Sequence, residues 1–202
     1  MEIVWVDDDA PAGAKLQTNS YPWQWVEAPE PVFSGKRAMK RTSQGLDQHF
    51  FTAAETPLTV YEEDVLFTYV YLDPADPPKE IMLQWNNGNW DHRVYWGENH
   101  IPYGSDGTVS RQRLGDLPAL GEWIRLEVPV NVVNLKPGEK INGWAFTQWG
   151  GSVYWDKSGV VTRKGQPRKY RSLSKWAADL SAEKKPEAPK EIVEIAKKEA
   201  DQ

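Results

Sequence analysis

The sequence of 202 residues contains no cysteine. This absence excludes disulfides, thiolate metal sites and a cysteine nucleophile. It does not fix the compartment, because a secreted domain with a good core needs no disulfide. No stretch approaches the ~20 apolar residues of a membrane span, and residues 1–5 lack the basic and apolar regions of a signal peptide. We therefore expect no membrane insertion, and either a cytoplasmic protein or a module from a longer exported chain.

An excess of positive charge is also missing. The chain has 24 basic and 29 acidic residues and a formal net charge of −5, so a nucleic-acid partner is not expected. The common catalytic signatures are absent as well: no H-E-x-x-H, no G-x-S-x-G, no P-loop and no dinucleotide fingerprint. Paired carboxylates for glycoside hydrolysis stay open, because any chain with this many acids offers candidates. We predict that the protein is not an enzyme.

Tryptophan is unusually abundant. The sequence has 11 Trp against 5 Phe, with 8 Tyr besides. A core can be built from Leu, Val and Phe, whereas Trp combines a flat apolar face with an N–H group and suits surfaces that are both apolar and polar. This composition favours a binding protein.

Short strands separated by turns, without amphipathic helices between them, predict the fold. We expect an all-β protein, an antiparallel two-sheet β-sandwich of jelly-roll type, over residues 1–162. The expected strands are 3–6, 22–26, 38–43, 46–53, 65–72, 81–85, 90–96, 123–128, 141–149 and 152–156. The predicted turns are Asn86-Asn87-Gly88, which makes 81–96 a hairpin, and Gly150-Gly151. Residues 163–202 are predicted to be a basic segment, a linker and a short helical tail.

The 81–96 hairpin carries the densest set of candidate binding residues. Flat rings beside Asp, Gln, His and Arg suit a sugar, whose ring stacks on an aromatic face while polar groups bond its hydroxyls. The predicted carbohydrate-binding residues are Trp85, Trp90, Asp91, His92, Arg93, Tyr95, Trp96 and Trp149, with Gln84 as a further hydroxyl partner. Strand alternation divides them between two faces, so only one subset can line one site. For any single tryptophan the alternative is burial in the core.

Acidic residues near both ends of the sandwich suggest a metal. Asp7 and Asp8 follow the first expected strand, and Asp156 ends the last one. If the terminal strands pair, these carboxylates meet, and Ca²⁺ prefers such oxygen ligands. We therefore predict a structural Ca²⁺ held by Asp7, Asp8 and Asp156. The alternative is a solvated acidic loop.

Several segments resemble a known module. They include Phe67-Thr-Tyr-Val-Tyr-Leu-Asp-Pro74, Trp90-Asp-His-Arg-Val-Tyr-Trp-Gly97, Gly121-Glu-Trp123 and Trp155-Asp156. This pattern resembles the carbohydrate-binding-like β-sandwich module of planctomycetal PSD1-type cytochrome c proteins, and also modules in YD-repeat (Rhs-type) proteins. The resemblance implies an exported, extracellular or periplasmic module that binds polysaccharide within a multidomain protein. The haem of such relatives would lie elsewhere, because this chain has no C-x-x-C-H motif.

The sequence thus predicts a non-catalytic carbohydrate-binding module of a larger exported protein. Its partners would be a polysaccharide or oligosaccharide and neighbouring domains of the same chain. Two alternatives stay open: a docking domain whose aromatic surface packs against another part of the same long protein, and a glycosidase-like enzyme.

Overall fold

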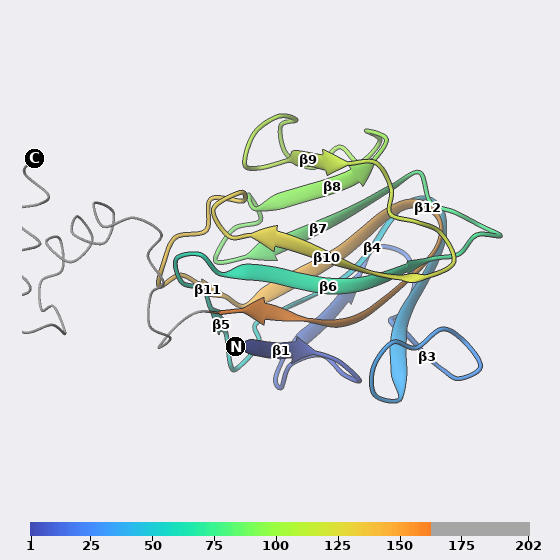
Figure 1. The fold of residues 1–202 in the computed structure, drawn as a ribbon, viewed down its shortest axis with the longest axis horizontal. Helices are drawn as coiled ribbons and strands as arrows, with labels where there is room; N and C mark the ends of the chain where they lie inside the picture. Colours follow the sequence, from blue (N-terminus) through green and yellow to red (C-terminus); the bar gives the residue numbers. More distant parts are fainter. Residues whose placement is uncertain (163–202) are drawn as a thin grey trace, which may run out of the picture. The chain divides into compact units, whose positions relative to one another are not determined.

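A computed structural model describes residues 1–162, which form twelve β-strands and no α-helix (Figure 1). Within these residues no helix could cross a membrane. The predicted basic segment, linker and helical tail at 163–202 lie outside the described residues. The all-β prediction for the rest of the chain is confirmed.

The strands follow one another with short connections, as the spacing of turn residues predicts. Their bounds are β1 Glu2–Val6, β2 Lys15–Thr18, β3 Gln24–Glu27, β4 Arg37–Thr52, β5 Leu58–Thr59, β6 Val65–Leu72, β7 Glu80–Asn86, β8 Arg93–Gly97, β9 Gln112–Gly115, β10 Trp123–Pro129, β11 Lys140–Ile141 and β12 Gly143–Val161. All pairs are antiparallel except β8 with β9.

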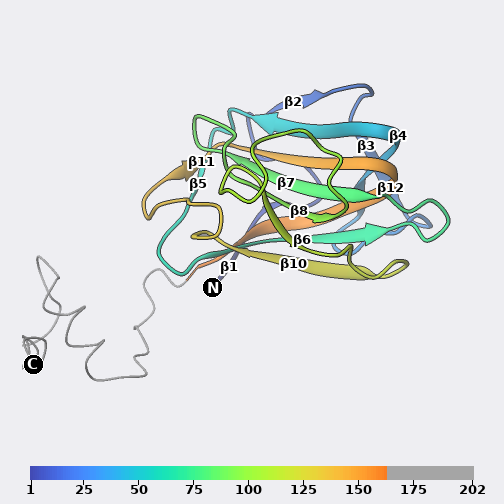
Figure 2. The same ribbon diagram turned by 90° about the horizontal axis from the view of Figure 1, so that it is seen from above.

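Two layers arise because β4 and β12 are long enough to take part in both. In the first layer the order is β2, the second half of β4, the first half of β12, β7, β8 and β9. Figure 2 shows β2, β4, β12 and β7 side by side in this layer. In the second layer the order is β3, the first half of β4, the second half of β12, β6 and β10, and β1 pairs with the end of β12. The predicted sandwich is confirmed in this form.

The prediction of a hairpin turn at Gly150-Gly151 is wrong. β12 runs on through both glycines, and its pairing with β4 shifts register between Trp149 and Gly151. Both glycines have positive φ, at 70° and 72°, so the strand bulges and bends from one layer into the other without reversing. β4 pairs with β12 on both sides of this register shift and does not reverse either. The two strands expected at 38–43 and 46–53 are therefore one strand, β4.

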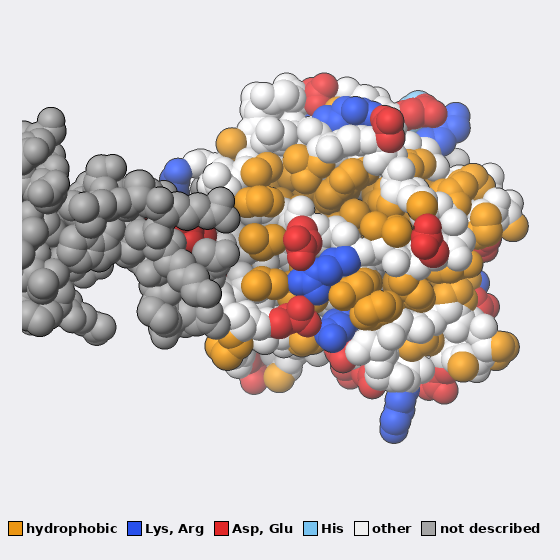
Figure 3. All heavy atoms as spheres, in the orientation of Figure 1, with side chains coloured by type: hydrophobic (Ala, Val, Ile, Leu, Met, Phe, Trp, Pro, Cys, Tyr) orange, Lys and Arg blue, Asp and Glu red, His pale blue; other side chains and the backbone are white. Residues whose placement is uncertain are grey.

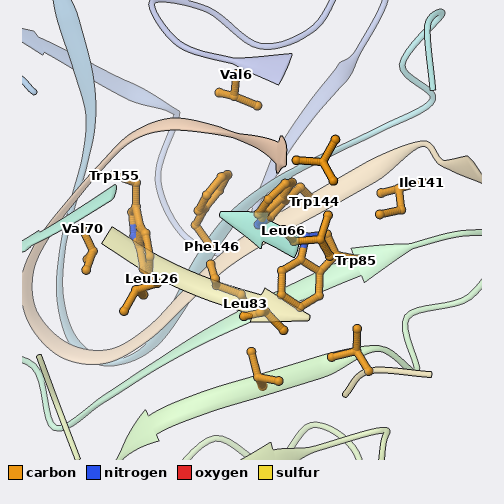
Figure 4. Packing of buried hydrophobic residues seen from close by; sticks show 14 of the residues in the cluster. Val6, Leu66, Val70, Leu83, Trp85, Leu126, Ile141, Trp144, Phe146 and Trp155 are labelled. Carbon is orange, nitrogen blue, oxygen red and sulfur yellow. The ribbon is translucent and has the colours of Figure 1, made fainter. Parts of the chain in front are cut away.

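Large aromatic residues fill the interior between the layers. Figure 4 shows Trp85, Trp144, Phe146 and Trp155 in this core among aliphatic side chains, and all four are at most 1% exposed. The indole N–H groups of the three tryptophans find no hydrogen-bond partner. Burying an aromatic side chain this large stabilises the fold by roughly 2–3 kcal/mol or more. Part of the tryptophan excess therefore serves the core and not a binding surface.

Candidate functional site

A pocket of about 210 Å³ lies on the outer face of the first layer. It is lined by residues from four strands, one turn and one long loop. These residues are Gln48, Phe50, Gln84, Trp90, Arg93, Tyr103 and Ala145.

The floor of the pocket is one row of side chains across the sheet. Phe50 pairs with Ala145, Ala145 with Gln84, and Gln84 with Arg93, so the four residues lie side by side on β4, β12, β7 and β8. Neighbours in register point to the same face of a sheet. Ala145 is the smallest of them and lies between Phe50 and Gln84. The hollow therefore follows from a small residue on a central strand.

Amide and hydroxyl groups next to this floor form a closed hydrogen-bond network. The Gln84 Nε2 donates to Gln48 Oε1 at 3.0 Å and to Thr147 Oγ1 at 2.8 Å. The Thr147 hydroxyl donates to Gln48 Oε1 at 3.1 Å, and Arg93 Nε donates to Gln84 Oε1 at 2.8 Å. Both amide hydrogens of Gln84 are engaged, and its oxygen accepts the bond from Arg93. The network holds the polar side of the pocket in one geometry.

Two aromatic rings form the other side. Phe50 and Trp90 meet edge to face, and both side chains are half-buried. Trp90 lies in the turn between β7 and β8, where the Asn86 and Asn89 side chains accept backbone N–H groups of Gly88 and Asp91. Asn and Gly favour such turns because they tolerate unusual backbone angles and cap free N–H groups. The turn thereby carries the indole over the sheet face.

Loop 98–111 closes one end of the pocket. Glu80 holds this loop, because its Oε2 accepts the backbone N–H groups of His100 and of Ile101, the latter at 2.8 Å. Ile101 is fully buried against Met82 and Tyr95, and the Tyr95 hydroxyl donates to Asp106 at 2.8 Å. Burial raises the pKa of Glu80 although the two N–H groups act against the shift. The loop is therefore part of the packed structure of the layer.

One ion pair sets the charge of the pocket. Arg93 Nη1 lies 3.2 Å from Asp91 Oδ1 and also donates to the Ser110 carbonyl at 3.0 Å. Arg93 is the only charged residue among those that line the pocket in the described part of the chain. Because Asp91 offsets its charge, the pocket is close to neutral.

Three of the predicted binding residues come together here. Trp90 and Arg93 line the pocket, and Asp91 is paired with Arg93. Gln84, expected as a hydroxyl partner, also lines it. The predicted hairpin is confirmed, since β7 and β8 pair in antiparallel register.

The other predicted residues lie elsewhere. Trp85 and Trp96 point into the core, at 0% and 8% exposed, and Tyr95 lies under loop 98–111 at 1%. His92 is buried, with Nδ1 2.7 Å from the Val133 carbonyl oxygen. Trp149 is half-buried and stacks on His100. The first four side chains are not available as an exposed platform, because strand alternation or the loop directs each into packed surroundings, whereas Trp149 lies outside the pocket.

Sequence reasoning missed Gln48, Phe50, Tyr103 and Ala145. The signal for the first two is the alternation in β4, where His49 and Phe51 are at most 1% exposed while Gln48 and Phe50 face outward. The local sequence pattern does not indicate that β4 lies near the 81–96 hairpin. β12 lies between them in the sheet, and it is the last strand of the described residues.

The predicted metal ligands are not equivalent. Asp156 is fully buried, and its Oδ2 accepts the backbone N–H groups of Phe33 at 2.8 Å and Ser34 at 3.0 Å. The Ser34 hydroxyl donates to Asp7 Oδ2 at 3.4 Å, so Asp7 and Asp156 lie together, and Asp7 Oδ1 is buried without a partner. Burial raises the pKa of Asp156 to about 6, and the charge of Asp7 adds to the shift.

Asp8 has different partners from this pair. Its Oδ1 accepts the backbone N–H groups of Lys36 at 2.6 Å and Arg37 at 3.0 Å, and these bonds lower the pKa of Asp8. Over residues 1–162, no three His, Asp or Glu side chains gather closely enough to hold a metal ion. The structure thus brings Asp7 and Asp156 together and uses Asp8 to anchor the start of β4.

A second aromatic surface covers the outer face of β6 and β10. Figure 3 shows hydrophobic side chains over this face, interrupted by charged groups. Phe33 stacks on Tyr69 with centroids 3.7 Å apart, whereas Trp123 is tilted by 58° to Phe33 and by 54° to Tyr71. The tilted rings do not share a plane, and Trp123 is not among the residues that line the pocket. This surface is less suited to a flat sugar ring than the pocket.

The sequence matches no protein-family profile and no curated protein. Similar solved structures include the K3 adhesin domain of Lys-gingipain from Porphyromonas gingivalis, with a TM-score of 0.49, 15% identity, and coverage of 80% of this chain and 99% of that one. TmCBM61 in complex with β-1,4-galactotriose gives a TM-score of 0.46 at 9% identity, over 75% and 90% of the two chains. The CBM22-1 xylan-binding domain of Paenibacillus barcinonensis Xyn10C gives 0.42 at 12%, over 78% and 91%. Carbohydrate-binding modules and adhesin domains are therefore among the solved structures to which this chain is similar.

Proposed function

We propose that this protein is a carbohydrate-binding module whose ligand site is the pocket of Phe50, Trp90 and Arg93. The observation that carries the proposal is the juxtaposition of two half-buried aromatic rings with a closed amide network on one sheet face. A pyranose has an apolar face and a rim of hydroxyls. It can contact the rings through the face and the polar groups through the rim.

Donors remain for such a ligand. Arg93 Nη2, the Trp90 indole N–H and the Tyr103 hydroxyl donate none of the hydrogen bonds described above. Hydroxyl oxygens accept from all three groups. Both amide hydrogens of Gln84 are engaged inside the network and its oxygen accepts the Arg93 Nε–H group, so Gln84 holds Arg93 in place.

The surroundings of the pocket support a non-catalytic role. Glycoside hydrolysis needs two carboxyl groups about 5–9.5 Å apart on either side of the scissile bond. No carboxylate lines this pocket in the described part of the chain, and nearby Asp91 is paired with Arg93. Binding without cleavage is the function that this set of groups serves.

The test is binding of the purified chain to a glycan array, followed by calorimetry on each hit. We expect binding that falls at least tenfold in Trp90→Ala. Trp123→Ala is the matched control, because Trp123 is also a half-buried indole but lies on the other layer. Both variants should keep the circular dichroism of the parent. Failure of every glycan to bind, or an equal loss in both variants, contradicts the proposal and favours a docking role for the aromatic surfaces.

The wider setting is also part of the proposal. We take the sandwich to be of jelly-roll type and the module to belong to a larger exported protein, in line with the planctomycetal and YD-repeat resemblance of its segments. Secretion of the full-length gene product, detected in the periplasm or medium, is the measurement that checks the exported setting.

A structural Ca²⁺ beside Asp7 and Asp156 is a separate proposal. Two neighbouring carboxylates repel each other, and the partnerless Asp7 Oδ1 offers a ligand atom. Backbone carbonyls and water would supply the remaining ligands of the usual six to eight. Asp8 is left out of the proposal, because no contact joins its carboxylate to Asp7 or Asp156 in the described residues, and its Oδ1 accepts the backbone N–H groups of Lys36 and Arg37 instead.

Calcium-dependent thermal stability tests this site. We expect Tm to rise on adding Ca²⁺ to chelator-treated protein, as for any ligand that binds only the folded state. Asp7→Asn should abolish the rise, whereas the matched variant Asp8→Asn should keep it. An unchanged Tm of the parent in excess chelator contradicts the proposal.

A further inference from the structure

The pocket is closed at the end where loop 98–111 crosses the sheet. One row further along the same face, Met82 and Tyr95 follow Gln84 and Arg93, and they are only 0% and 1% exposed. Ile101 covers both residues. A ligand therefore cannot continue along the sheet past the row of Arg93.

Tyr103 and Asn19 complete the wall. The Asn19 amide donates to the Tyr103 hydroxyl at 3.4 Å, and its oxygen accepts from Gln48 Nε2 at 3.3 Å. Asn19 follows β2, whereas Tyr103 belongs to loop 98–111. The contact thus joins segments from opposite edges of the layer across one end of the pocket.

Two of the four polar lining residues lie at this closed end, and Gln84 and Arg93 lie on the row before it. Gln48 and Tyr103 lie at the wall, and Phe50 and Trp90 contact each other on the row before it. The volume of about 210 Å³ is below the ~300–1,000 Å³ of sites for drug-sized ligands. This volume suits one or two sugar units, and the wall blocks a longer chain at this end.

The pocket also offers no fork for an acidic sugar. Arginine binds a carboxylate best with two parallel N–H bonds. In Arg93 the Nε is used by Gln84 and the Nη1 by Asp91 and Ser110, which leaves Nη2 alone. The neighbouring Asp91 carboxylate further disfavours an anion.

From these observations we infer that the pocket binds the terminal one or two units of a neutral glycan chain, not internal units of the chain. The inference rests on the proposed function and adds to it the part of the glycan that is recognised. A wall at one end, with Gln48 and Tyr103 against it and the rings beside Gln84 and Arg93 on the row before it, suits the end of a chain.

Calorimetry with β-1,4-linked gluco-, xylo- and galacto-oligosaccharides of one to six units tests the inference, together with the corresponding polymers. We expect affinity to rise up to two units and then stay within twofold, with one module bound per chain at every length. Polygalacturonate should bind at least tenfold more weakly than neutral galactan.

A set of results would overturn this inference while leaving the proposed function intact. Affinity that climbs tenfold or more between two and six units, several modules per polymer chain, or equal binding of polygalacturonate would each do so. Failure of all neutral series and of the glycan array overturns both proposals. The two failures are therefore distinguishable.

A variant that removes the wall gives an independent check. Tyr103→Ala should open the closed end, so that affinity now increases with chain length. Tyr21→Ala is the matched control, because Tyr21 is 63% exposed and does not line this pocket. If Tyr103→Ala keeps the length profile of the parent, the wall does not select chain ends and the inference fails.

Discussion

Trp90 meets Phe50 edge to face, with ring centroids 5.7 Å apart and planes at 89°. The two residues come from the turn after β7 and from β4, and β12 lies between these strands. The contact therefore bridges the small Ala145 on the floor of the pocket. It positions both rings for a ligand before any ligand arrives.

This contact predicts coupling between the two rings in binding. Phe50→Ala and Trp90→Ala should each weaken glycan binding, and the double variant should lose less than the product of the single losses. Removing one ring releases the other from a contact worth about 0.5–1.5 kcal/mol, so we expect a coupling of up to roughly 12-fold. A double-mutant cycle by calorimetry measures it. Strictly multiplicative losses would show that the rings act independently.

Glu80 is predicted to control the order of loop 98–111. Glu80→Ala removes the acceptor of the His100 and Ile101 N–H groups and leaves the buried Ile101 donor without a partner, at a cost of about 1–3 kcal/mol. Hydrogen exchange in 98–111 should quicken in this variant, and glycan binding should weaken. Glu80→Gln is the control, because its amide oxygen can still accept both bonds. Slow exchange in Glu80→Ala would contradict a role for this carboxylate in holding the loop.

Local patterns predict much of this fold. The alternation of β-rich residues in 65–72 and 123–128 and the Asn-Gly turn of the 81–96 hairpin give strands β6, β10, β7 and β8 nearly as observed. They also place Trp90, Asp91 and Arg93 near one another, because these residues lie in one turn or directly after it. These predictions succeed because they depend only on residues that are close in sequence.

The rest depends on long-range pairing. Trp96 and Arg93 look equally suited to a sugar, but only the packing of the second layer against β8 makes the former core and leaves the latter in the pocket. Phe50 joins the site through a strand that lies two places away in the sheet. Single-sequence patterns do not specify which strands become neighbours, so the members of a site built across four strands cannot be read from them.

The bend of β12 gives a prediction about the two glycines that the sequence suggested as a turn. An added Cβ at Gly151 would lie 2.3 Å from the Pro78 nitrogen and 2.5 Å from the Pro77 carbonyl carbon, whereas at Gly150 it meets nothing within 4 Å. Both residues have positive φ, which costs alanine about 1 kcal/mol. Gly151→Ala should therefore lower the free energy of unfolding by several kcal/mol, and Gly150→Ala by only about 1 kcal/mol. Equal losses of unfolding free energy in the two variants, measured by urea denaturation, would mean that the backbone of 77–78 moves aside for the added methyl group.

His49 gives the protein a predicted acid sensitivity. It lies between Trp23 and Phe146 with both ring nitrogens buried and without hydrogen bonds, and burial, with the charge of Arg41 as a second cause, lowers its pKa well below 6.5. Above pH 6.5 the ring is neutral in both states and has no effect. Below pH 6.5 the imidazole binds a proton in the unfolded chain but not in the folded one, so the contribution of His49 to stability falls by on the order of 2 kcal/mol by pH 5. His49→Leu should remove this loss, whereas Phe146→Leu should keep it. Urea denaturation at pH 7.5 and 5 measures the difference, and parallel pH profiles for the parent and His49→Leu would contradict it.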